Sequence, residues 1–255
     1  MKRLITLPCW FIFIILPSLA FAQSQERGEQ LLQQAGQKVL PWPEMSFVAS
    51  IDDRASTRRS VHKYNVFYKG DKVLIAYVAP AAENGNLLLM ENDDLWFYSN
   101  DTRRPTRITP MQKMSGSVSF GDITNLSWKN YEVMSTEEVT IEQENVKKDA
   151  FLLHLSSNKK STTYQKVEFW IEKYTKRPIM AVAYLHSGRK YKTIRYIKYE
   201  VVDGKDINTE LNFIDHFNEE KVSAVRLTLI KQERGLPGRY FIKTSLAEVS
   251  NEVCR

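Results

Sequence analysis

The amino-acid sequence predicts a mainly-β fold of the α+β class: one curled antiparallel sheet of about 11 strands, with an N-terminal helix and a short helical or loop plug over an apolar cavity. Three observations predict it. Apolar residues alternate with a period of two through most of the chain, one amphipathic segment of helical period precedes them, and residues 110–130 show no clean alternation. The chain has 255 residues, of which 43% are hydrophobic, which fits a single globular domain.

The first 22 residues have the pattern of a secretory signal peptide. Met1-Lys2-Arg3 is basic, residues 4–16 form an uncharged apolar run, and Ala20-Phe21-Ala22 places small residues at −3 and −1 of a cleavage site before Gln23. The alternative is an uncleaved anchor, but the run is shorter than the roughly 20 residues that a membrane span needs. We therefore expect an exported protein with one domain over residues 23–255.

Cleavage would change the charge and the cysteine content. Loss of Lys2 and Arg3 lowers the formal net charge from +6 to +4, which does not favour nucleic-acid binding. Cys9 also leaves, so Cys254 remains alone and no internal disulfide is expected.

Residues 25–40 are predicted to form the N-terminal helix. Their apolar positions recur at spacings that place them on one helical face, and they are Leu31, Leu32, Ala35, Val39 and Leu40. Pro41-Trp42-Pro43 ends the helix, because proline disfavours the helical conformation before it and has no N–H to donate.

The rest of the chain is predicted to be strands joined by hairpins. Turn pairs such as Gly188-Arg189 and Asp203-Gly204 fall where hairpins need them. Within residues 110–130, Asp122 is a candidate N-cap for a helix over 123–128. The predicted strands are 45–51, 64–68, 73–78, 87–90, 95–98, 104–108, 131–141, 150–156, 165–172, 179–185, 191–202, 206–217 and 222–230, with 240–244 as a further candidate.

Several strands are apolar on both faces, namely 73–78, 95–98 and 169–171. A large sheet curls because its twist accumulates, and an amphipathic helix would bury its apolar side on the concave face. Two interpretations stay open. In the first, helices and loops cover both faces of these strands and form an ordinary core. In the second, the apolar rows enclose a cavity for an apolar ligand.

The apolar rows give the candidate ligand-binding residues. The odd positions are the more apolar ones on strands 45–51 and 165–172, and the helix would meet them with its own apolar side chains. The residues predicted from these patterns are Leu31, Leu32, Phe47, Ile51, Val167, Phe169 and Ile171.

Catalytic chemistry is not predicted. The sequence contains no G-x-S-x-G, H-E-x-x-H, C-x-x-C, phosphate-binding loop or dinucleotide fingerprint, and its four histidines are far apart along the chain. We therefore expect no catalytic residues, metal or cofactor. Arg58-Arg59, Arg103-Arg104 and Arg107 are either solvated strand edges or a patch for an anionic lipid surface.

Taken in order, several segments resemble the outer membrane lipoprotein-sorting protein family, the LolA-like periplasmic carriers. The resemblance covers roughly residues 25–250. It implies a half-barrel sheet with a helical plug over an acyl-chain cavity, and it adds Trp96 and Tyr98 to the predicted ligand-binding residues. The segments that carry the resemblance are 95–98 (LWFY), 102–108 (TRRPTRI), 116–123 (GSVSFGDI), 70–72 (GDK), 167–172 (VEFWIE) and 188–196.

The function that follows is a non-enzymatic periplasmic carrier of lipid or lipoprotein acyl chains toward the outer membrane. The resemblance implies an inner-membrane lipid-exporting permease and an outer-membrane acceptor as partners, no nucleic acid, and a monomer. Two alternatives stay open. One is an envelope-stress or lipid sensor that partners an inner-membrane protein, and the other is a lipid hydrolase.

Overall fold

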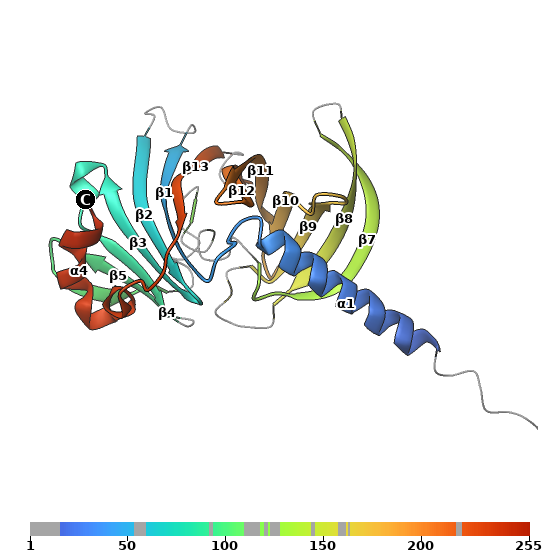
Figure 1. The fold of residues 1–255 in the computed structure, drawn as a ribbon, viewed down its shortest axis with the longest axis horizontal. Coiled ribbons are helices and arrows are strands. Elements are labelled where there is room, and N and C mark those ends of the chain that lie inside the picture. The colour runs from blue at the N-terminus through green and yellow to red at the C-terminus, as the bar shows by residue number, and fades with distance from the viewer. Residues whose placement is uncertain are drawn as a thin grey trace, which may run out of the picture.

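The structure is a computed structural model that describes residues 16–53, 60–91, 94–109, 118–119, 122, 128–143, 146–157, 162, 164–217 and 221–255, with side chains from Ser24 onward. Within these residues it contains one antiparallel sheet of 13 strands, somewhat more than the about 11 expected from the sequence (Figure 1). The strands are β1 (Glu44–Asp53), β2 (Ser60–Lys69), β3 (Lys72–Ala79), β4 (Leu87–Glu91), β5 (Asp94–Ser99), β6 (Arg104–Arg107), β7 (Glu132–Gln143), β8 (Val146–Ser156), β9 (Lys166–Glu172), β10 (Pro178–Tyr184), β11 (Lys190–Val202), β12 (Lys205–Asp215) and β13 (Lys221–Gln232).

The strand order places β6 and β7, which follow one another in the chain, at opposite edges of the sheet. Strands β1 to β6 extend in one direction, and β13 to β7 extend in the other, so that β1 pairs with β13 at the centre. β6 and β7 are therefore the two edges of an unclosed sheet. The chain passes from one edge to the other between Arg107 and Glu132, and its described residue Trp128 belongs to the main hydrophobic core.

Irregular pairing accompanies the curl of the sheet. The pairing register shifts between β1 and β13, between β2 and β3, between β7 and β8, and between each pair of neighbouring strands from β9 to β12. Such bulges increase the local twist of the sheet. The result is a sheet with a concave and a convex face, as the sequence predicts.

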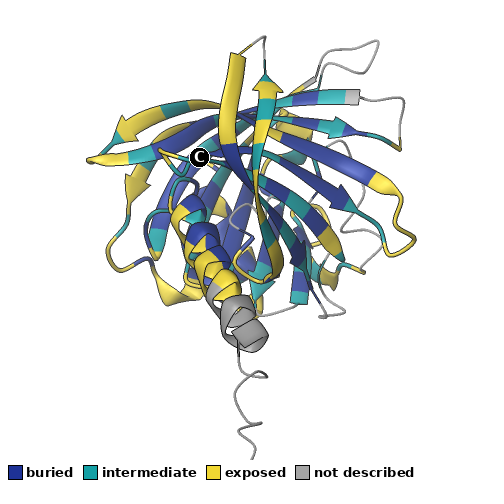
Figure 2. Ribbon diagram, turned by 90° about the vertical axis from the view of Figure 1, so that its right-hand side faces the viewer, coloured by how far each residue is buried: buried dark blue, intermediate teal, exposed yellow. Residues whose placement is uncertain are grey.

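Two helices cover different parts of this sheet. α1 (Leu16–Gly36) lies near β7, and α4 (Leu246–Val253) lies near β3 and β5 at the other side of the molecule (Figure 1). α1 is buried along one stripe and exposed elsewhere (Figure 2). None of the helices in the described part of the chain has the length and apolar character that crossing a bilayer requires.

The buried apolar residues form two clusters. The larger, which we call the concave core, joins α1 to the inward rows of the strands. The smaller, which we call the convex core, joins α4 to outward rows of β3, β4 and β5, and includes Leu74, Leu89 and Leu246. The interpretation that both faces of these strands are covered is therefore correct for β3 to β5.

The two ends of the chain and the region of residues 123–128 differ from, or lie outside, what the sequence predicts. The candidate strand 240–244 is wrong, because this region forms the 3-10 helices Gly238–Phe241 and Lys243–Ser245, followed by the unpredicted α4. The helix expected over 123–128 lies mostly outside the described residues. The helix expected from residue 25 already begins at Leu16, and the predicted signal peptide stays a prediction.

Candidate functional site: an apolar cavity beside helix α1

Seven of the nine predicted ligand-binding residues meet in the concave core. Leu31 and Leu32 reach it from α1, and they are spaced with Ala35 and Val39 along the buried stripe of that helix. The others come from inward positions of β1 and β9, and all are buried. These five are Phe47, Ile51, Val167, Phe169 and Ile171.

Trp96 and Tyr98 are the exceptions, because the structure does not place them on the concave face where they were predicted to line the cavity. Tyr98 belongs to the convex core, and Trp96 packs against that core. The opposite face of β5 carries Leu95 and Phe97 to the concave core. The sequence of β5 is apolar on both faces, because α4 and the 3-10 helices cover the outer one, so alternation could not choose the correct face.

A cavity of about 780 Å³ opens between α1 and the start of β1. Of the predicted residues, Leu32 lines it. Its other apolar walls are Leu40, Trp42 and Tyr68, and the Tyr68 ring stacks on Phe47 of the concave core at a centroid distance of 5.9 Å. A volume of this size falls within the range of small-molecule sites.

Leu40, Trp42 and Tyr68 were not among the predicted ligand-binding residues. Pro41-Trp42-Pro43 served only as a helix stop in the sequence analysis, although two prolines fix the backbone around Trp42 and make it a rigid apolar wall. Tyr68 shares its face of β2 with Val66, and the period of two along this strand was the available signal.

Aromatic side chains fill the concave face farther along the sheet. Trp128 packs against Tyr131 at 5.4 Å and against Phe169 at 6.3 Å between ring centroids. Its indole N–H donates to the Tyr196 hydroxyl over 3.0 Å. The predicted residue Phe169 is therefore covered by a residue of the β6–β7 connection in this conformation, and the open volume lies nearer to α1.

A buried ion pair holds the β6–β7 connection against the sheet. Lys192 is 0% exposed and Asp122 is 1% exposed, and the Lys192 ammonium donates to Asp122 Oδ2 over 2.6 Å. Ser119 N–H and the hydroxyls of Ser119 and Tyr164 also donate to this carboxylate. Burial, and then the neighbouring carboxylate, raise the pKa of Tyr164, which keeps its hydroxyl a donor.

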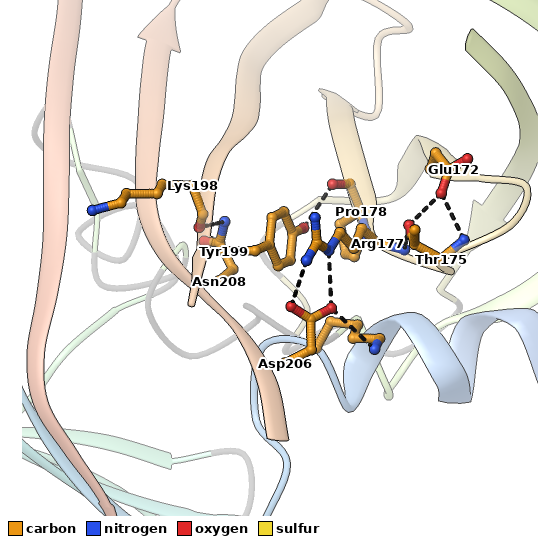
Figure 3. Close-up of polar contacts among 9 residues, drawn as sticks. Glu172, Thr175, Arg177, Pro178, Lys198, Tyr199, Asp206 and Asn208 are labelled. Atoms are coloured by element: carbon orange, nitrogen blue, oxygen red, sulfur yellow. Dashed lines mark hydrogen bonds and ion pairs between the residues drawn. The ribbon is translucent and has the colours of Figure 1, made fainter. Parts of the chain in front are cut away.

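A second ionic cluster fixes the end of α1 to the sheet (Figure 3). The Arg177 guanidinium makes two hydrogen bonds to Asp206, at 2.9 and 2.8 Å, and lies over the Tyr199 ring. Lys38, just after α1, approaches the same carboxylate to 3.1 Å, and its carbonyl accepts the Asn208 N–H. The Arg177 hydrogen bonds, assisted by Lys38, lower the pKa of Asp206.

The middle of α1 docks on the edge strand β7. The Glu29 carboxylate accepts the Val133 N–H over 2.9 Å, which satisfies one donor of the edge strand. Gly28 sits so close that a Cβ there would lie 2.6 Å from both Thr136 Oγ1 and Val133 Cγ1. α1 is thus positioned as one wall of the cavity by contacts in its middle and just after its C-terminal end.

A second hollow, of about 500 Å³, opens on β8 to β10. His154, Lys166 and Glu168 line it, and the Tyr184 hydroxyl donates to Glu168. Of the predicted residues, Val167 lines it. Both hollows have charged side chains in their walls, and the one beside α1 is the larger, so we take it as the candidate.

Solved structures share this fold over nearly their whole length. A LolA superfamily protein from Nitrosomonas europaea has a TM-score of 0.74 and 27% identity, covering 85% of this chain and 98% of its own. A putative outer membrane lipoprotein-sorting protein domain from Vibrio parahaemolyticus has a TM-score of 0.72 and 18% identity, covering 88% and 99%. A DUF1329 family protein from Desulfovibrio piger has a TM-score of 0.70 and 21% identity, also covering 88% and 99%.

A family model whose description is that of an uncharacterized protein matches residues 69–248, which is more than half of the chain. The chain belongs to this family, and its fold is LolA-like. No curated protein matches the sequence. The LolA-like fold confirms the family resemblance and the curled, unclosed sheet that the sequence predicts.

Proposed function

We propose that this LolA-like protein is a non-enzymatic periplasmic carrier that holds the acyl chains of a lipid or lipoprotein and moves them toward the outer membrane. The observation that carries the proposal is the cavity of about 780 Å³ beside α1, with Leu32, Trp42 and Tyr68 in its walls. The description of one structural neighbour as a LolA superfamily protein, and of another as a putative outer membrane lipoprotein-sorting protein domain, supports it.

The energetics favour such a cargo. Each methylene moved from water into an apolar site contributes about 0.8 kcal/mol, so even half of a long acyl chain offsets the cost of ordering it. In this proposal α1 moves when the chain is released. The contacts that would break are those of Gly28 and Glu29 in the middle of the helix and of Lys38 just after its C-terminal end. An inner-membrane permease as donor and an outer-membrane acceptor complete the proposal.

The experiment is native mass spectrometry of the protein secreted into the periplasm of a Gram-negative host and purified without detergent. We expect bound species of lipid mass that organic solvent releases, and fewer of them in the cavity variant Trp42→Ser. The matched control is Trp170→Ser, on β9 away from this cavity. Wild-type protein that carries no lipid, and that binds no palmitate when titrated with it, would overturn the proposal.

A further inference from the structure

One side of the cavity beside α1 is a polar stripe. Glu26, Gln30, Gln33 and Gln37 recur at spacings of four, three and four, so they lie on one face of the helix and its C-terminal extension. All four are exposed and line the cavity, opposite the apolar Trp42 wall. A ligand with its chain on the apolar wall would therefore place its headgroup against this stripe.

The charges at this cavity are mainly negative. Glu26 and Glu29 line it, and Glu29 uses Oε1 to accept the Val133 N–H. Lys129 is the one basic residue among the described lining residues, and it is already bound to Asp71 Oδ1 at 2.5 Å and to the Gly70 carbonyl at 3.0 Å. The positive charge of Lys129 is thus offset by Asp71, and the carboxylates of Glu26 and Glu29 leave the described lining negative.

The C-terminal end of α1 disfavours an anion at the other end of the cavity. The cavity reaches Gly36 and Gln37 there, roughly two to three helical turns from Glu29 and Glu26, and the negative end of the backbone dipole acts only within the last turn. A phosphate is normally held by arginine forks, lysines or helix N-termini, and the described lining residues provide none of these uncompensated.

We propose that the cavity selects acyl lipids whose headgroup carries an ammonium group and no net negative charge, with Glu26 and Glu29 as the specificity-determining residues. The proposal rests on the proposed carrier function and names its class of cargo. The ammonium would lie between the two carboxylates, and the glutamine amides would accept or donate hydrogen bonds around it. No covalent step is involved.

The test compares three lipids with identical 16-carbon chains and different headgroups: a cationic dialkyl ammonium-propane, an uncharged diacylglycerol and an anionic phosphatidylglycerol. Each displaces the same fluorescent monoacylglycerol from the protein in neutral detergent micelles at low salt. For the wild type we expect the cationic lipid to compete about tenfold or more better than the anionic one, and the difference to shrink in high salt.

The double variant Glu26→Gln/Glu29→Gln removes both charges, and the amide oxygen at position 29 can still accept the Val133 N–H. We expect its cationic-to-anionic ratio to approach one, and diacylglycerol competition on the same variant serves as the reference for acyl-chain binding. Glu138→Gln is the control, because Glu138 contacts α1 through Arg27 but does not line the cavity. Its ratio should equal that of the wild type.

The outcomes separate the two proposals. Diacylglycerol binding with no preference for the cationic lipid, or with a preference for the anionic one, would overturn the headgroup selection and leave the carrier function standing. A ratio that the double variant does not change would also overturn the role of the two carboxylates. Failure of all three lipids to displace the probe would contradict the carrier function itself.

Discussion

Replacement of Gly28 by alanine tests how α1 is held on the sheet. The added Cβ would lie 2.6 Å from Thr136 Oγ1 and from Val133 Cγ1, well inside van der Waals contact, and both atoms belong to β-branched side chains that cannot move far. Overpacking of this kind costs about 1–3 kcal/mol. In an unconstrained helix the same replacement would stabilise by about 1 kcal/mol, because alanine is the better helix former.

We therefore expect Gly28→Ala to change the free energy of unfolding by about 0 to −2 kcal/mol, as the sum of the two opposing effects. Urea unfolding at constant pH measures it. Val133→Ala removes one of the clashing atoms, so the double variant should be more stable than the two single changes predict. Gln34→Ala, on an exposed part of the same helix, is the control. A gain of about 1 kcal/mol in Gly28→Ala, with no coupling to position 133, would refute the close contact between α1 and β7.

Three further predictions concern the ionic contacts and the cysteine. Lys192→Met leaves Asp122 buried without its cation and should lower the free energy of unfolding by about 3–5 kcal/mol, measured with urea. Adding Asp122→Asn should restore part of that loss. A Lys192→Met variant as stable as the wild type would contradict the buried ion pair. Asp206→Asn should cost about 1 kcal/mol at pH 7. Because the folded protein lowers the pKa of Asp206, that difference should begin to shrink below about pH 4 and be lost as the pH falls through the lowered pKa of the folded state, and a constant difference down to about pH 2 would count against it. Burial raises the pKa of Cys254, so a thiol reagent should label it slowly in the native state and rapidly in urea, whereas equal rates would show that the C-terminus is open.

Local periodicity predicted most of the secondary structure. The spacing of Leu31, Ala35 and Val39 predicted the helix. Alternation, together with short continuous apolar runs at 73–78, 87–90 and 95–98, predicted the strands of the sheet to within a few residues. The C-terminal helix α4 was missed, although Leu246, Val249 and Val253 have helical spacing, because the segment is short and follows irregular 3-10 turns.

The candidate site was harder to predict, because it depends on contacts between residues far apart in the sequence. Lys192 and Asp122 are 70 residues apart in the sequence, and neither residue type indicates burial by itself. Trp96 and Tyr98 were assigned to the wrong face because α4 covers the outside of β5. The wall of Trp42 and Tyr68 exists only because the end of α1 is held next to the β2–β3 turn.

The most direct test of an acyl-chain cavity beside α1 is to map where a bound chain lies. A photoreactive palmitate is bound to the protein, irradiated, and the labelled peptides are identified by mass spectrometry. We predict labelling of the segments around Leu32, Trp42 and Tyr68, and none on the outer face of β5 around Trp96. Labelling confined to the outer face, or spread evenly over the surface, would contradict the account.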